Sequence, residues 1–264
     1  MYPFDEDIAV TQRGDGQYAG VISSKWSINE VPNGGYLMAL MANAMLQNGH
    51  MAASPIVTAN FLRRSQPGGA AIAVERMSQS RQFERFEARL QQDGEEKIRA
   101  FGTFADEKNE CALESYQAPP LYIADLSQCV PIPEIPGFTI YRHLDIRLDP
   151  ACTGWFEGRL SDQSEMRGWI RFRDSRHFDV PSILLVADAF PPAVLSSQGM
   201  VAWVPTLEYS VSFRNMPVTD WLKCVFSTRY ITCGLLEEDG EIWDADDNLV
   251  AISRQTAQYK AQPA

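Results

Sequence analysis

Hydrophobic and polar positions in the first half of the chain predict a buried helix followed by antiparallel strands. Residues 33–48, NGGYLMALMANAMLQN, are apolar nearly all round after a suitable N-cap, Asn33, which is typical of a helix inside a protein. Residues 83–91, FERFEARLQ, alternate between apolar and charged side chains, as a half-exposed strand does. A second strand-like segment, residues 97–105, follows Asp93-Gly94, so the two segments predict a hairpin.

The second half repeats this order of elements. The segments FTIYRHLDIRL, GWFEGRL and GWIRFR are expected to be strands, and the apolar residues 182–198 are expected to form a helix. Further strand-like segments follow, with a hairpin at DADDN. Arg64 precedes Pro67, and Arg214 precedes Pro217, at the ends of corresponding strands, so the repeats are offset by about 150 residues. One buried helix per antiparallel sheet predicts an α+β protein in which each sheet wraps around its helix.

A polar, proline-rich region separates the two repeats. It includes DEKNECALESYQAPP and VPIPEIPG, which are typical of a crossing linker. We therefore divide the chain into an N-terminal repeat over residues 1–106, a linker over residues 107–137 and a C-terminal repeat over residues 138–264. The sequence GDGQYAG near the N-terminus lacks the βαβ context of a dinucleotide-binding turn, and it predicts a hairpin instead.

The overall composition narrows the classes of partner. The 264 residues carry a net charge of −11 at pH 7 and no obvious basic face, which disfavours nucleic-acid binding. No apolar run approaches the roughly 20 residues that span a bilayer, and no signal-peptide pattern is present, so we expect a cytoplasmic protein without membrane insertion. Five cysteines without a CxxC pair indicate free thiols, and His50, His143 and His177 are too widely spaced to indicate a metal site.

One carboxylate, Asp188, lies within the apolar segment 182–198. Such an acid is normally paired, at a helix cap or functional, because a charge that leaves water without a partner is destabilising. From the pattern alone, two interpretations stay open. In the first, residues 183–187, ILLVA, form a strand and Asp188 caps a short helix whose first turn holds Pro191 and Pro192. In the second, Asp188 is a base whose pKa is raised by its apolar neighbours. The prolines favour a kinked or late-starting helix.

The chain resembles the double hotdog acyl-CoA thioesterases of type II, the TesB-like group. In the first half the resemblance rests on NGGYLMALMANAM, TANFLRRSQPGG and FEARLQQDGEEKIRAFGTFA. In the second half it rests on VADAFPPAVL, PTLEYSVSFR and NLVAISRQTAQ. The resemblance implies a tandem hotdog fold that hydrolyses acyl-CoA thioesters, with coenzyme A as part of the substrate and no further cofactor. The two repeats would associate as single hotdog chains do in dimers, and we expect that the protein can form a homo-oligomer.

In that family a helix aspartate, a strand threonine and a glutamine of the last strand form the catalytic site. The matching positions in this chain are Asp188 in VADAF, Thr206 in VPTLEYS and Gln255 in ISRQTAQ. The resemblance implies that the aspartate takes a proton from a water molecule held by the other two side chains, without a covalent intermediate. Many relatives carry an Asp-His pair after the threonine, where this chain has Leu207-Glu208-Tyr209, so the substrate class stays open.

Two further groups of residues are candidates for substrate binding. Gly34 and Gly35 open the first helix, where they either expose N–H groups as an oxyanion hole or simply allow close packing. Arg63, Arg64 and Arg81 are candidates for the phosphates of coenzyme A, although strand-end arginines are often solvated or salt-bridged. The first helix has no acid, so we expect one complete site per chain.

Two other functions stay open from the sequence. The hotdog hydratases use an Asp and a His five residues apart on the helix, whereas Ala193 stands five residues after Asp188 in this chain. A non-catalytic binder of acyl-CoA or lipid would keep an apolar pocket but tolerate loss of the three candidate catalytic residues. All three are present, which favours an enzyme.

Overall fold

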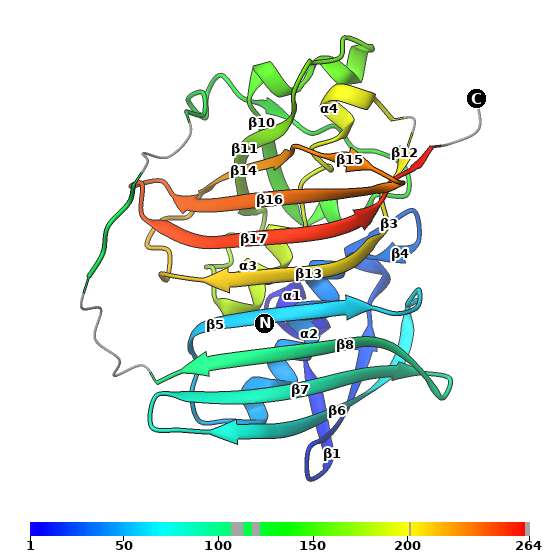
Figure 1. Ribbon diagram of the computed structural model, residues 1–264, viewed down its shortest axis with the longest axis vertical. Coiled ribbons are helices and arrows are strands. Elements are labelled where there is room, and N and C mark those ends of the chain that lie inside the picture. Colours follow the sequence, from blue (N-terminus) through cyan, green and yellow to red (C-terminus); the bar gives the residue numbers. More distant parts are fainter. Residues whose placement is uncertain (107–112, 118–121, 201, 262–264) are drawn as a thin grey trace.

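One large antiparallel sheet forms most of the molecule (Figure 1). The structure is a computed structural model that describes residues 1–106, 113–117, 122–200 and 202–261. The first half of the sheet runs in the order β1 (Val10–Gly14), β2 (Gln17–Ile22), β6 (Gly68–Gln79), β7 (Phe83–Gln92), β8 (Glu95–Ala105) and β5 (Ala53–Phe61). The second half continues with β13 (Thr206–Phe213), β17 (Leu249–Gln258), β16 (Leu235–Asp244), β14 (Leu222–Thr228), β11 (Ser164–Phe172), β10 (Leu144–Leu148) and β9 (Val130–Pro131).

Five further short strands of the described residues lie beside this path. β15 (Ile231–Thr232) pairs with β16. β3 (Ser27–Ile28) pairs with β4 (Val31–Pro32), and β12 (Ala202–Trp203) pairs with β18 (Lys260–Ala261). The helices are α1 (Pro3–Asp7), α2 (Gly34–Asn48), α3 (Val180–Ala187) and α4 (Leu195–Gln198), with 3-10 turns at Ser24–Trp26, Thr139–Arg142, Pro150–Cys152 and Gly154–Glu157.

The two halves of the sheet are joined edge to edge and related by an approximate two-fold symmetry. β5 pairs with β13, and at its centre Thr58 Oγ1 lies 2.8 Å from Ser210 Oγ, a hydrogen bond between equivalent residues. At the ends of these strands, Leu62 N–H donates to the Lys97 carbonyl as Arg214 N–H does to the Val250 carbonyl. Both comparisons place the repeats 152 or 153 residues apart. Arg214 is therefore the equivalent of Leu62, and the Arg64 match predicted from the sequence is displaced by two residues.

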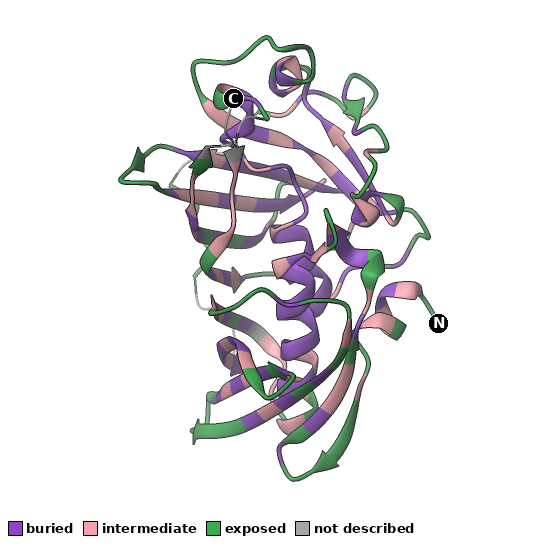
Figure 2. Cartoon of the chain, turned by 90° about the vertical axis from the view of Figure 1, so that its right-hand side faces the viewer, coloured by how far each residue is buried: buried purple, intermediate pink, exposed green. Residues whose placement is uncertain are grey.

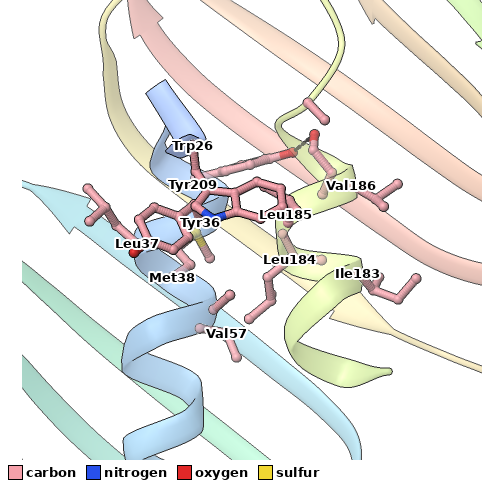
Figure 3. Close-up of a cluster of buried hydrophobic side chains, with 14 of the residues drawn as sticks. Trp26, Tyr36, Leu37, Met38, Val57, Ile183, Leu184, Leu185, Val186 and Tyr209 are labelled. Atoms are coloured by element: carbon pink, nitrogen blue, oxygen red, sulfur yellow. Dashed lines mark hydrogen bonds between the residues drawn. The ribbon is translucent and has the colours of Figure 1, made fainter. Parts of the chain in front are cut away.

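The helices α2 and α3 pack against each other on the inner side of the sheet, where the buried residues gather (Figure 2). A Cβ atom placed on Gly35 would lie 2.3 Å from the Leu184 carbonyl oxygen, so the backbones approach closely only because this residue has no side chain. Large apolar side chains of both helices fill the space around this contact (Figure 3). Burial of each Leu or Met contributes roughly 1.5–3 kcal/mol.

The structure confirms the α+β architecture predicted from the sequence, and several local expectations with it. Asn33 is the N-cap of α2 and accepts from the Tyr36 N–H at 2.9 Å. The inward residues of β7 alternate with outward ones. The turn between β7 and β8 has positive φ at both Asp93 and Gly94. The GDG segment forms the turn between β1 and β2.

Two segments differ from their predicted strands. GWFEGRL begins with the 3-10 turn Gly154–Glu157, because Gly154 lies too close to the Arg159 carbonyl for a side chain and Gly158 has a φ of 72°. FTIYRHLDIRL is a strand only over β10, after a 3-10 turn. Of the expected linker, residues 107–112 and 118–121 lie outside the described residues, and residues 130–131 contribute β9 to the sheet.

The apolar segment around Asp188 is helical earlier than the sequence predicted. α3 begins after Asp179, whose side chain forms a capping box with Ser182. It ends before Pro191 and Pro192, which separate it from α4. The prediction of a kinked or late-starting helix is therefore wrong, since the prolines follow the helix instead of opening it. The strand considered for residues 183–187 is wrong as well, because these residues lie within α3. Asp188 is the residue directly after α3.

Candidate active site

A cavity of about 790 Å³ opens where the start of α2, the end of α3 and the strands β13, β16 and β17 meet. Its wall is largely apolar, with Phe61, Phe190 and Trp203 among the lining residues. Met38 and Met41 of α2 are fully buried in the core and do not line it. Four polar side chains of interest do line it: Asp188, Thr206, Glu238 and Gln255.

The carboxylate of Asp188 sits at the N-terminus of the other helix, α2. Its Oδ2 atom accepts the Gly35 N–H at 2.9 Å and the Asn33 Nδ2–H at 2.8 Å. Asn33 also donates to the Asp188 main-chain carbonyl at 2.7 Å. The amide of Asn33 thus caps α2 with its oxygen and holds Asp188 with its nitrogen. The sequence suggested the capping role and missed the second one, because the two residues are far apart in the chain.

Two opposing effects set the pKa of Asp188. Burial among apolar side chains raises it, and the hydrogen bonds from Gly35, Gly34, Asn33 and Gln255 lower it by stabilising the ionised form. The positive end of the α2 dipole acts in the same direction as these hydrogen bonds. Burial is the larger effect, and the pKa of Asp188 is raised to about 6. The carboxylate is therefore ionised at neutral pH but more basic than an exposed aspartate.

Gln255 approaches the other oxygen of Asp188 from the sheet, and Thr206 is bonded to Gln255. Gln255 on β17 faces the cavity, and its Nε2 atom lies 3.5 Å from Asp188 Oδ1. The same Nε2 donates to the Thr206 hydroxyl at the start of β13. Thr206 accepts from Gln255, so its own hydroxyl hydrogen is available to a further acceptor. The structure therefore brings together all three residues that the sequence nominated as catalytic.

Tyr209, which the sequence analysis did not single out, supports the end of α3. Its hydroxyl donates to the Ala187 carbonyl directly before Asp188, and its ring lies in the core beside Leu185 and Val186 (Figure 3). Burial raises the pKa of this hydroxyl, so it stays a donor at all ordinary pH values. The inward position of Tyr209 on β13 was readable from the strand period, but its partner was not.

Glu238 is the second carboxylate among the described residues that line the cavity, and it was not among the candidates nominated from the sequence. It lies on β16 opposite Gln255 of β17, with Leu236 and Gly240 on the same inward face. A signal was present, since an acid at an inward position of an otherwise apolar strand face is unusual. Burial is the main cause that raises the pKa of Glu238 to about 7.

The two glycines at the start of α2 have a different role from the oxyanion hole considered above. The Gly35 N–H donates to Asp188 Oδ2, and hydrogen bonding from the Gly34 N–H also stabilises that carboxylate. These donors are engaged within the protein, so the expectation that they face a substrate oxygen is corrected. They position the acid instead.

The structure groups only two of the three predicted arginines with the cavity. Arg63 and Arg64 line it, and Lys260 joins them. Arg63 Nε lies 4.0 Å from Glu95 Oε2 in an exposed ion pair, which is a weak one. Arg81 lies just before β7, at the end of that strand that pairs with Ala105 of β8. Measured along the strands, this end is roughly 20 Å from the cavity. Its assignment to the same phosphate group is therefore corrected.

The described residues give no support to metal chemistry at this site. They contain no group of three or more His, Cys, Asp or Glu side chains placed to hold a metal ion. None of His50, His143 and His177 is among the cavity's lining residues.

No helix within the described ranges is long and apolar enough to cross a membrane.

Comparison with protein families matches both halves of the chain. Residues 126–259 match the family model of the acyl-CoA thioesterase C-terminal domain, and residues 22–105 match that of the acyl-CoA thioesterase N-terminal domain. Among curated protein sequences, none matches the chain.

Solved structures share the fold over nearly the whole chain. A candidate thioesterase II from Thermobifida fusca YX has a TM-score of 0.88 at 24% identity, covering 98% of both chains. A protein with a hot dog fold from Alicyclobacillus acidocaldarius has a TM-score of 0.87 at 20% identity, covering 100% of both. Acyl-CoA thioesterase II TesB2 from Mycobacterium marinum has a TM-score of 0.77 at 18% identity, covering 99% of both. The predicted double hotdog fold is confirmed by these likenesses and by the two matched domains.

Proposed function

The chain belongs to the acyl-CoA thioesterase family, and from this premise we propose that Asp188 activates a water molecule for direct attack on the thioester carbonyl of an acyl-CoA. Thr206 and Gln255 hold that water. The acyl group lies in the apolar cavity, and the coenzyme A phosphates lie near Arg63 and Arg64 at its rim.

The observation that carries this proposal is the difference between the two oxygens of Asp188. Oδ2 is fixed by two donors from the start of α2. Oδ1 faces Gln255, which is bonded to Thr206, inside the cavity. An acid that merely capped α2 would need only the first oxygen. The second oxygen, Oδ1, is a base in a fixed position next to Gln255 and Thr206, whose side chains can hydrogen-bond water.

The reaction then needs only groups already at the site. The water oxygen attacks the carbonyl carbon while a water proton passes to Asp188 Oδ1. The tetrahedral intermediate collapses, the carbon–sulfur bond breaks, and the thiolate of coenzyme A leaves and takes up the proton. The free acid and the thiol are the products, and Asp188 returns to its ionised form. Positioned general-base catalysis of this kind typically contributes about 10² to 10⁴-fold.

A hydratase on this fold is disfavoured by the residue five positions after Asp188. Ala193 occupies the position where the resembling hydratases carry a histidine, and its backbone N–H is bonded to Glu238. A non-catalytic binder would keep the cavity but has no use for a carboxylate oxygen held beside Gln255.

The test of the proposed function is thiol release from a panel of acyl-CoAs of short, medium and long chain, with aromatic members included. We expect turnover of at least one of them by the wild-type protein. Tight binding of acyl-CoAs without release of thiol from any member of the panel would overturn the hydrolase proposal and favour the binder.

Thr206→Val is expected to lower kcat by ~10 to 10²-fold, because the isosteric change removes one hydrogen bond of about 1–3 kcal/mol to the attacking water. Since Gln255 donates to Thr206, the two act as one unit. The double variant with Gln255→Leu should therefore cost less than the sum of the two singles. Thr256→Val, on the opposite face of β17, is the matched control and should leave kcat unchanged. Strictly additive losses would contradict the shared role.

The dependence of kcat/KM on pH follows from the sign of the Asp188 pKa shift. The base must be ionised, so kcat/KM should fall about tenfold per unit below the pKa of about 6 and level off above it. Glu238 titrates in the same cavity with a pKa of about 7, so the apparent pKa values read from the profile belong to Asp188 and Glu238 together. The Glu238→Gln variant retains Asp188 and should keep the acid limb. A flat profile between pH 5 and 8 would argue against Asp188 as the base.

A further inference from the structure

Glu238 faces the cavity from β16, and its two neighbours in the strand, Glu237 and Asp239, face away from the cavity. On β16, Leu236 and Gly240 are buried on either side of it, two residues away in each direction. The neighbouring Asp239 points to the opposite face, where Arg254 pairs with it at 2.6 Å. The other acid on the inward face, Asp244, lies at the end of the strand, where it accepts the Asn248 N–H and does not line the cavity. Glu238 is thus the acid of β16 that lines the cavity, with Phe190 and Phe226 among the apolar residues around it.

The first repeat shows that the fold does not need an acid at this position. Glu238 pairs with Gln255 between β16 and β17, and the corresponding pair between β7 and β8 is Phe86 with Gly102. Glu238 follows Phe86 by 152 residues, and Gln255 follows Gly102 by 153 residues. The hydrogen bonds at the strand ends, described above, show the same two offsets. An aromatic side chain therefore fills the equivalent position in the repeat that lacks the candidate catalytic residues.

One oxygen of Glu238 has a partner and the other has none among the described residues. Oε2 accepts the Ala193 N–H at 2.6 Å and so ties down the segment between α3 and α4. No hydrogen bond reaches Oε1 from the described side chains or backbone, and the residue lines the cavity. A carboxylate oxygen in apolar surroundings without a donor is destabilising, unless water or a ligand supplies one.

We propose that Glu238 selects acyl groups that carry a hydroxyl within a few carbons of the thioester carbonyl, by accepting a hydrogen bond from that hydroxyl. This inference rests on the proposed function and adds the substrate class to it. The position follows from the sheet, because cross-strand neighbours such as Glu238 and Gln255 have Cβ atoms about 4.5–5.5 Å apart. Gln255 lies at the reacting centre, so Glu238 meets the first part of the acyl chain.

A purely structural role for Glu238 predicts a different outcome. If it only tied down Ala193, its loss would affect every substrate alike through the position of that segment. A role in recognition changes the ratio between hydroxylated and unsubstituted substrates, because the acid contacts only the former. The ratio of kcat/KM values is therefore the informative quantity.

The experiment measures thiol release from acyl-CoAs of one chain length that carry a hydroxyl at carbon 2, 3 or 4, or none. At pH 8, above the Glu238 pKa of about 7, wild type should prefer one hydroxylated member over its parent by ~10 to 10²-fold in kcat/KM, as a hydrogen bond to a charged acceptor allows. Glu238→Leu should abolish that preference or reverse it. Glu238→Gln keeps an acceptor for Ala193 and should reduce the preference without disturbing the fold. Asp239→Asn, on the outer face of β16, should retain it.

The outcomes separate this inference from the proposed function. Hydrolysis with no preference for any hydroxylated substrate, or with a preference that persists in Glu238→Leu and Glu238→Gln, would overturn the role of Glu238 and leave the thioesterase intact. If no acyl-CoA of any kind releases thiol, the proposed function fails and this inference fails with it.

Discussion

Asp188→Asn is expected to lower kcat for the best acyl-CoA by about 10² to 10⁴-fold, with a much smaller change in KM. The replacement has nearly the same shape, and its side-chain oxygen can still accept from the Gly35 N–H. It has no basic oxygen to take a proton from water. The measurement is steady-state thiol release together with thermal unfolding, which should show a folded protein.

The matched control for this variant is Asp145→Asn. Asp145 is also a buried carboxylate, but it pairs with Arg147 and Arg171 and does not line the cavity. We expect this change to affect stability and to leave kcat near the wild-type value. Equal rates for wild type and Asp188→Asn would mean that Asp188 serves only to hold the start of α2, and the proposed mechanism would be wrong.

Gly35→Ala is expected to destabilise the fold by about 3 kcal/mol and to lower activity in the protein that remains folded. The added methyl would lie 2.3 Å from the Leu184 carbonyl oxygen and 2.9 Å from the Asp188 Cβ, both within the contact between α2 and α3. Neither backbone can move without separating the helices. The separation would also pull the Gly35 N–H away from the Asp188 carboxylate. Chemical denaturation and kcat are the two measurements.

Gly69→Ala is the control for this substitution. A Cβ on Gly69 meets nothing within 4 Å, and the residue does not have a positive φ. It should leave the free energy of unfolding and kcat close to their wild-type values. An equally small effect of Gly35→Ala would show that the close approach of the helices is not needed for the site.

The elements with strong local patterns were predictable from the sequence. The apolar stretch after Asn33 is α2, and the alternation along β7 has the expected inward face. GWFEGRL was assigned to a strand because its aromatic and charged residues alternate. The tight approach of Gly154 to a backbone carbonyl, which no pattern displays, makes it a turn.

The internal arrangement of the site was less accessible from the sequence. The resemblance nominated Asp188, Thr206 and Gln255, and the structure brings them together. The support of Asp188 by Asn33 depends on the packing of two helices from different repeats, which local patterns do not encode. Glu238 was accessible to local patterns, since its inward position on β16 could have been predicted from the two-residue alternation of a strand.

The approximate symmetry relates the candidate site to positions of different composition in the first repeat. Positions that hold Glu238 and Gln255 in the second repeat hold Phe86 and Gly102 in the first. The first repeat instead contributes the start of α2, with Asn33 and Gly35, to the site of the second. The site is therefore built from both repeats, and neither contains all of its parts.

The most direct test of the central claim, direct attack by water activated by Asp188, is a rapid-quench measurement of a single turnover on the best acyl-CoA. Direct attack by water predicts that free acid and coenzyme A appear at the same rate, and that the peptide containing Asp188 carries no acyl group after an acid quench. Release of coenzyme A ahead of the acid, with the acyl group recovered on that peptide, would contradict it and make Asp188 a nucleophile.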